Sequence, residues 1–186
     1  MIRIGIVVGS TRPGRNAENV ARWVHDLAAK RGDAEYEVVD LREFGLPHLD
    51  EAVPAAMGVY EHPHTRAWAA KVATFDGFVF VTPEYNSSFP GALKSGLDFL
   101  HAEWTDKAAG LVSYGVDGGV RAAEHLRQVL GRLKIADVSG QVSLSLFTDF
   151  EDMTVFRPAA HHEDKLDAML GQVVSWSAAL RPLRAA

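Results

Sequence analysis

The pattern of apolar and polar positions changes period several times along the chain. Runs of strand length, dominated by apolar residues, occur at 2–8, 35–41, 77–82, 108–114 and 138–146, the last of which fits one or two strands. Apolar residues at three- and four-residue spacing predict helices over 17–28, 65–75, 92–101, 120–133 and 163–180. Strands that alternate with helices predict a parallel sheet with helices on both of its faces.

In such a sheet, ligands bind beyond the carboxyl ends of the strands. Three loops of unusual composition follow the first, third and fourth predicted strands, at 9–16, 83–91 and 115–119. We therefore expect the functional site where these three loops meet. Segment 42–64 has three prolines and no clear period, and a loop of that length is usually functional or covers a partner surface.

Composition narrows the classes of function. The 186 residues predict one domain, and a net charge of -5 argues against a nucleic-acid partner. The chain has no cysteine, which excludes disulfides, thiolate nucleophiles and cysteine-ligated metals, so redox chemistry would need a cofactor or another metal site. The charged N-terminal run resembles a strand rather than a signal peptide, and no apolar run is long enough to cross a membrane. We expect a soluble, cytoplasmic protein without a membrane partner.

The first loop, Gly9-Ser10-Thr11-Arg12-Pro13-Gly14-Arg15-Asn16, joins a strand to a helix. Its glycine spacing is that of a triphosphate loop, but Arg-Asn stands where Lys-Ser/Thr is needed, and the Gly-x-Gly-x-x-Gly dinucleotide pattern is missing. Hydroxyl, amide and guanidinium donors at a helix N-terminus suit a single terminal phosphate better. Asn16 is also the expected N-cap of the helix. The alternative is a surface turn with solvated arginines.

The second loop, Thr82-Pro83-Glu84-Tyr85-Asn86-Ser87, combines an aromatic ring, an amide and backbone groups at the end of a strand. This mixture suits the edge of a planar heterocycle. A turn in which Tyr85 covers the core explains it equally well.

The third loop, Ser113-Tyr114-Gly115-Val116-Asp117-Gly118-Gly119, is rich in glycine. Glycine has no Cβ and lets a ligand approach the backbone, although Gly118-Gly119 is also what a tight turn before a helix requires.

Other catalytic patterns are missing. The histidine pairs 62/64 and 161/162 lack the i, i+4 spacing of a helical zinc motif, so we interpret them as surface residues and expect no metal site. No Gly-x-Ser-x-Gly elbow of a serine hydrolase occurs.

Taken together, the three loops resemble those of the NADPH-dependent FMN reductase family, which includes quinone and azo-dye reductases. The resemblance covers residues 2 to about 145, with motifs in the family's order and spacing: Gly9-Ser10-Thr11-Arg12 with Asn16, Thr82-Pro83-Glu84-Tyr85-Asn86 with Pro90-Gly91-Ala92-Leu93-Lys94, and Ser113-Tyr114-Gly115 with Gly118-Gly119. Many relatives carry Ser or Thr near position 15. Arg15 therefore either adds charge at the phosphate or points at the 2′-phosphate of NADPH.

The resemblance implies a three-layer α/β/α, flavodoxin-like fold with strand order 2-1-3-4-5. It also implies bound FMN, NADPH or NADH as reductant, and ping-pong hydride transfer to a quinone, azo compound or free flavin, with no catalytic side chain. Tyr85 and Asn86 would shape the substrate face, and the protein would be a homodimer or a tetramer. A flavodoxin-like electron carrier and a domain that has lost its cofactor are the alternatives. The implied cofactor-binding residues are Ser10, Thr11, Arg12, Arg15, Asn16, Pro83, Glu84, Tyr85, Asn86, Ser113, Tyr114, Gly115, Gly118 and Gly119.

Overall fold

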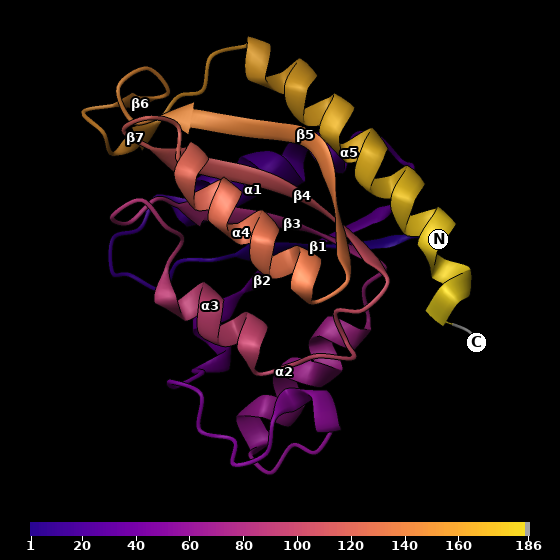
Figure 1. Cartoon of the computed structure of the whole chain (residues 1–186). Helices are drawn as coiled ribbons and strands as arrows, with labels where there is room; N and C mark the ends of the chain where they lie inside the picture. Colours follow the sequence, from indigo (N-terminus) through magenta and orange to yellow (C-terminus); the bar gives the residue numbers. More distant parts are fainter. Residues whose placement is uncertain (185–186) are drawn as a thin grey trace.

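A five-stranded parallel sheet forms the centre of the computed structural model, which describes residues 1–184 (Figure 1). Its order, β2-β1-β3-β4-β5, is the one that the resemblance implied. Both β3 and β4 are buried along their whole length because helices cover both faces of the sheet. The strands are β1 (Arg3–Val8), β2 (Glu35–Asp40), β3 (Gly77–Pro83), β4 (Lys107–Gly115) and β5 (Ile135–Ser145).

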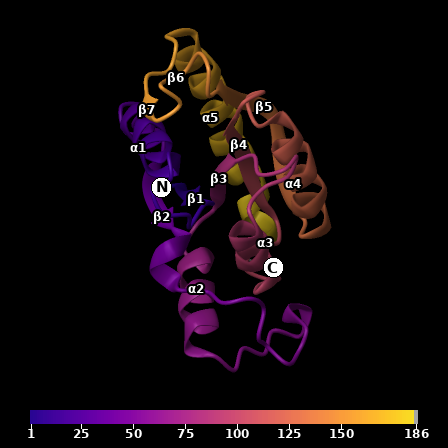
Figure 2. The same ribbon diagram turned by 90° about the vertical axis from the view of Figure 1, so that its left-hand side faces the viewer.

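The helices form two layers, as Figures 1 and 2 show. One core cluster joins the sheet to α1 and α5, and the other joins it to α2, α3 and α4. The helices are α1 (Ala17–Ala28), α2 (Pro63–Ala73), α3 (Gly91–Asp98), α4 (Val120–Arg132) and α5 (His161–Leu180). A hairpin of β6 (Phe150–Glu151) and β7 (Val155–Phe156) precedes α5, and short 3₁₀ helices are η1 (Leu41–Phe44), η2 (Ala55–Met57) and η3 (Arg181–Arg184).

The predicted elements are confirmed, with shifted ends. Helix α2 begins at Pro63 instead of residue 65, since the first helical position needs no N–H donor. The run predicted over 138–146 forms one strand, β5, which begins earlier at Ile135 and ends at Ser145. The long loop 42–64 holds two short 3₁₀ helices that its proline-rich sequence conceals.

One histidine prediction was wrong. His162 is buried, and its Nε2 lies 3.0 Å from Oδ1 of Asp149, which is also buried. The Asp149 carboxylate accepts hydrogen bonds from the amides of Ser145 and Ala159 as well. Burial lowers the pKa of His162 and favours its neutral form. Tertiary folding places the two side chains together, so their sequence spacing gave no signal.

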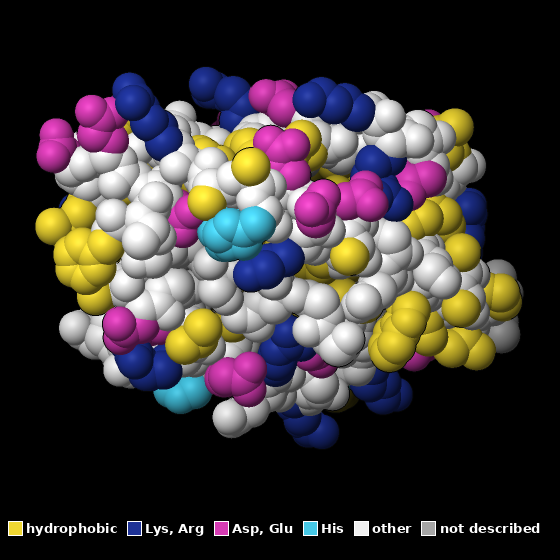
Figure 3. Space-filling model, turned by 90° about the horizontal axis from the view of Figure 1, so that it is seen from above, with side chains coloured by type: hydrophobic (Ala, Val, Ile, Leu, Met, Phe, Trp, Pro, Cys, Tyr) yellow, Lys and Arg dark blue, Asp and Glu magenta, His cyan; other side chains and the backbone are white. Residues whose placement is uncertain are grey.

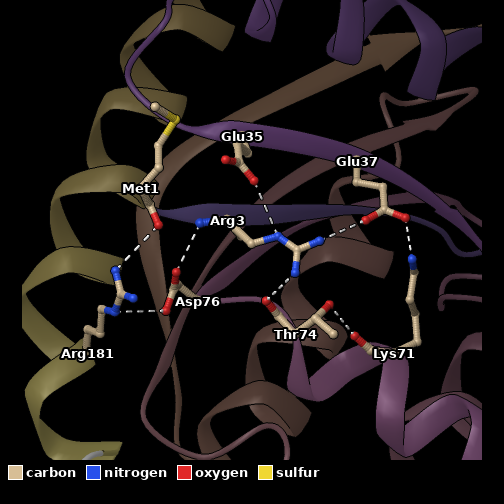
Figure 4. Close-up of polar contacts among 8 residues, drawn as sticks. All are labelled: Met1, Arg3, Glu35, Glu37, Lys71, Thr74, Asp76 and Arg181. Atoms are coloured by element: carbon tan, nitrogen blue, oxygen red, sulfur yellow. Dashed lines mark hydrogen bonds and ion pairs between the residues drawn. The ribbon is translucent and has the colours of Figure 1, made fainter.

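The amino ends of the strands are held by a polar network (Figure 4). Asp76 accepts a hydrogen bond of 3.0 Å from the amide of Arg3, and its carboxylate lies 3.7 Å from Nε of Arg181. The Arg3 guanidinium reaches Glu37 at 3.4 Å, and Glu37 also pairs with Lys71. This network ties the first strand to the end of α5, at the edge of the sheet opposite the three loops.

Charges of both signs cover the face that α5 occupies, which Figure 3 views from above. Lysine and arginine side chains lie among aspartate and glutamate there, with hydrophobic side chains gathered at two ends of the view. Across residues 1–184, none of the helices combines the length and the apolar character that a membrane span requires.

Candidate functional site

The predicted loops meet at one cavity beyond the carboxyl ends of β1, β3 and β4. Its volume is about 360 Å³, which lies in the range of small-molecule sites. Eight of the residues singled out from the sequence line it: Arg12, Arg15, Asn16, Pro83, Glu84, Tyr85, Tyr114 and Gly115. Four further lining residues were not predicted: Gly14, Leu146, Met153 and Thr154.

The first loop presents an open cationic side chain next to the start of α1. Arg12 is exposed, and among residues 1–184 no carboxylate forms an ion pair with it. Gly14 has a φ of +66°, a conformation that glycine adopts without strain, and it lets the chain turn into the helix. The helix N-terminus adds a partial positive charge at the same place, which favours an anion.

Ser10 lies beneath this loop and is buried. Its hydroxyl lies 2.9 Å from the hydroxyl of Tyr85 and accepts a long hydrogen bond of 3.4 Å from the amide of Arg12. Ser10 does not line the cavity, but it joins the first loop to the second and holds the Tyr85 ring in place.

Arg15 is engaged within the protein. Its side chain is only 2% exposed, forms ion pairs with Glu18 and Asp40, and donates to the carbonyl of Ser10. Burial alone would lower the pKa of the guanidinium, but the hydrogen bonds and charges of Glu18 and Asp40 raise it. Arg15 therefore lines the cavity with its charge already compensated, and it braces the loop against β2 and α1.

Asn16 stands at the N-cap position of α1, but the predicted cap by its side chain was wrong. Its Nδ2 instead donates to the carbonyl of Met153 at 3.0 Å, in the turn between β6 and β7. The Asn16 side chain thus contacts the hairpin turn instead of capping the amides of its own helix. Residues 16 and 153 are far apart in the sequence, so no sequence pattern indicates this contact.

The second loop is a tight turn from Tyr85 to Ser88, closed by hydrogen bonds of 2.8 and 3.1 Å between their backbones. Its central residues, Asn86 and Ser87, have φ values of 49° and 66°, which define a mirror-image turn in which asparagine is well tolerated. The amide of Glu84 donates to the carbonyl of Tyr114. Among the described residues, the amides of Asn86 and Ser87 donate no backbone hydrogen bond, although neither residue lines the cavity.

The carboxylate of Glu84 serves the neighbouring helix. It accepts hydrogen bonds from the amide of Arg121 at 3.1 Å and from Nε of the same residue at 2.7 Å, and a longer one from the amide of Ala122. A negative charge at the N-terminus of α4 is favourable. Glu84 thus lines the cavity, but its carboxylate is engaged by α4 and holds the second loop against that helix.

The third loop is a tight turn in its own right. Ser113 is buried and donates to the carbonyl of Gly118 at 2.7 Å. Gly118 and Gly119 have φ values of +74° and +70°, and a Cβ on Gly119 would lie 2.8 Å from the amide nitrogen of Tyr114. Backbone geometry therefore explains both glycines. Tyr114 is almost fully buried, and this burial raises the pKa of its phenol.

Thr11 faces away from the main cavity. It lines a smaller one of about 220 Å³ together with Arg42 and Ala92. Within residues 1–184, no group of three or more histidine, aspartate or glutamate side chains is placed to hold a metal ion.

The fold and the site together define a flavodoxin-like protein with a cavity at the carboxyl edge of its sheet, lined by the open Arg12 side chain. Residues 2–149 match the model of a family described as NADPH-dependent FMN reductase. The chain is 40% identical over 159 residues to an NAD(P)H-dependent FMN reductase of Schizosaccharomyces pombe, with 84% of this chain and 80% of that protein covered. It is 36% identical over 137 residues to a quinone reductase of Escherichia coli, with 69% of each covered.

Solved structures agree on the fold. A flavoenzyme NAD(P)H:(acceptor) oxidoreductase of Paracoccus denitrificans superposes with a TM-score of 0.72 at 19% identity, covering 96% of this chain and 98% of that one. The chain belongs to the NADPH-dependent FMN reductase family. It is accordingly an oxidoreductase whose class uses FMN and NAD(P)H.

Proposed function

We propose that this protein binds FMN in the cavity of about 360 Å³ and passes electrons from NAD(P)H to a quinone. The observation that supports this most strongly is the meeting of the open Arg12 cation, the N-terminus of α1 and the turn at Tyr85 around a single cavity. Among the relatives are a quinone reductase and a 2-hydroxy-1,4-benzoquinone reductase, which supports a quinone as the acceptor.

The residues present fit such a cofactor. Arg12 and the N-terminus of α1 would hold the phosphate with their positive charge. Pro83, Tyr85 and Gly115, which line the cavity on the second and third loops, would hold the flavin ring. Ser10, Arg15, Ser113, Gly118 and Gly119 build the loops from beneath, through the hydrogen bonds and backbone conformations described above.

When bound, FMN supplies the two-electron chemistry, and the chain contributes binding, orientation and electrostatics. The amides of Asn86 and Ser87, which have no backbone partner among the described residues, would be the donors of the second loop that stabilise developing negative charge on the ring. Tyr85 is held by Ser10 and so presents a fixed surface to the reductant and the acceptor. In the proposed ping-pong scheme, the reductant and the acceptor occupy the same surface in turn. Azo compounds and free flavin are further acceptors within the proposal.

A homodimer in the cytoplasm is part of the proposal. Leu49, Met57 and Val59 are half or more exposed on the long loop 42–64, and a second copy of the chain would cover this apolar surface. Light scattering at micromolar concentration should give the mass of a dimer, or of a tetramer built from it. The mass of a single chain would contradict this part of the proposal.

The test of the function is an absorption spectrum of the purified protein after FMN has been added and the excess removed. We expect a retained flavin spectrum that anaerobic NADPH bleaches and a quinone restores. A protein that retains no flavin would contradict the proposal. A flavin-containing protein that NADPH cannot reduce would instead be an electron carrier.

Arg12→Ala tests the phosphate assignment within the same experiment. It should raise the Kd for FMN by about tenfold or more, the loss expected when a charge-assisted contact is removed. Arg22→Ala removes an equally exposed arginine from the outer face of α1 and is the matched control. Equal FMN affinity of the two variants would exclude Arg12 as a phosphate ligand.

A further inference from the structure

The hairpin β6–β7 is the part of the cavity wall that the sequence pattern did not predict. It begins at Phe150, just beyond residues 2–149 that match the family model, yet Met153 and Thr154 in its turn line the cavity. Figures 1 and 2 show the hairpin at the carboxyl end of the sheet, close to the start of α1.

The base of the hairpin is anchored in the core. Phe150 is buried, and its ring centroid lies 6.0 Å from that of Tyr114 and 5.0 Å from that of Phe156. Phe156 in turn meets Trp23 of α1 edge to face at 5.7 Å. The buried Asp149 accepts a hydrogen bond of 2.8 Å from the amide of Arg157 at its carbonyl, which closes the hairpin at its root.

The turn of the hairpin is held over the first loop. The amide of Thr154 donates to the carbonyl of Glu151, and Asp152 and Met153 between them have φ values of 50° and 57°. The carbonyl of Met153 accepts the hydrogen bond from Asn16, the last residue of the first loop. A non-glycine residue at positive φ costs free energy, and here the anchored base and the Asn16 bond hold two such residues in succession.

We propose that Met153 and Thr154 are additional cofactor-binding residues of this chain, which wall the cavity beside the first loop and slow the release of bound FMN. This inference rests on the proposed function, because it takes FMN as the occupant. The proposal assigns a binding role to a segment outside the three loops, and the hydrogen bond from Asn16 to Met153 connects the first loop to the hairpin.

A pair of glycine variants tests the proposal. Met153→Gly removes a side chain that lines the cavity, and Asp152→Gly removes its neighbour, which does not line it. Both positions have positive φ, so glycine preserves the turn in each variant and the two are matched. Circular dichroism and the thermal midpoint verify that both remain folded.

FMN binding is measured by the quenching of flavin fluorescence on titration of the apoprotein, and its release rate by dilution of the complex. Because Met153 is half exposed, removing its side chain should raise the Kd and the release rate about fivefold, while Asp152→Gly stays within about twofold of the parent. Hydrogen exchange of residues 151–154 in the parent protein should slow when FMN is added. Equal release rates for both variants, or unchanged exchange at the turn, would overturn the hairpin assignment.

These outcomes separate the two proposals. A parent protein that takes up no FMN would end the proposed function before any variant is compared. A parent protein that binds FMN normally, with variants that also do so, would leave that function intact and remove only the role of the hairpin.

Discussion

The brace around Arg15 should matter more for stability than for direct contact with a ligand. Arg15→Met keeps the aliphatic length of the side chain but removes the guanidinium, so the carbonyl of Ser10 loses this donor and the carboxylate of Asp40 keeps only its hydrogen bond from the amide of Arg42. The Asp40 side chain is 19% exposed and can regain only part of its hydration. Glu18 is 50% exposed and loses little.

The size of the loss follows from these exposures. Removing one partner of a fully buried ion pair costs about 3–5 kcal/mol, and partial rehydration of Asp40 reduces this to roughly 2–4 kcal/mol. Urea unfolding of the apoprotein, followed by circular dichroism, measures the change. Arg22→Met, on the exposed side of α1, should change the unfolding free energy by no more than about 0.5 kcal/mol.

A double-mutant cycle with Asp40→Asn isolates the pair. We expect a coupling free energy of about 1–3 kcal/mol between the two positions. A loss of unfolding free energy below about 1 kcal/mol in Arg15→Met, together with a large fall in FMN affinity, would refute the stabilising role of Arg15. Arg15 would then be a phosphate ligand, as the sequence first suggested.

Three further predictions concern buried groups. Gly119→Ala should lower the thermal midpoint and weaken FMN binding, because φ is +70° and the new Cβ would lie 2.8 Å from the amide nitrogen of Tyr114. We expect the unfolding free energy to fall by about 1–3 kcal/mol. An unchanged midpoint would contradict this. Burial alone would raise the pKa of Asp149, but hydrogen bonds from backbone amides lower that pKa below its ordinary value of 3.8. The ionised carboxylate therefore contributes fully to the unfolding free energy above pH 3.8, and this contribution is lost as the pH falls further. Asp149→Asn should therefore be less stable than the parent protein by about 2–4 kcal/mol at pH 7. Urea unfolding at a series of pH values should show this difference narrowing toward about pH 3. A difference that does not change with pH would contradict a stabilising role of the ionised carboxylate. Burial lowers the pKa of Lys107 from 10.5 to about 8, so the charged amine disfavours folding. Lys107→Met should therefore raise the unfolding free energy by about 1–3 kcal/mol at pH 7, and this gain should disappear as the pH rises from 8 to beyond 10.5. A gain that persists at about pH 11 would contradict this prediction.

Most of the fold could be predicted because its determinants are local or periodic. The spacing of apolar residues in α1 indicates Ala17, Val20, Ala21, Val24, Leu27 and Ala28 as its buried face, and the structure buries all of them except Leu27, which is partly exposed. The apolar runs of β3 and β4 indicated strands, and the structure buries every residue of each. The motifs of the three loops likewise revealed the family, since their order and spacing survive in the sequence itself.

The roles of individual polar residues could not be predicted in the same way. Arg15, Glu84 and Asn16 are all charged or polar residues in the predicted loops, and each has a partner on another element: Asp40, Arg121 and Met153 respectively. These three contacts join segments that are separate in the sequence, so no spacing reports them. The phosphate-loop motif thus pointed to the edge of the sheet where the structure has a cavity, while it left open which of its donors remain available.

The sequence by itself determined the alternation of strands and helices, the edge of the sheet where the loops gather, and the family. Only the tertiary structure decided which arginine of the first loop has no ion pair within residues 1–184, how the histidine at 162 comes to be buried against Asp149, and that the hairpin at 150–156 lines the cavity. The physical reason is the range of the interactions. Periodicity and turn propensity act over a few residues, whereas ion pairs and cavity walls join segments that meet only when the sheet has formed.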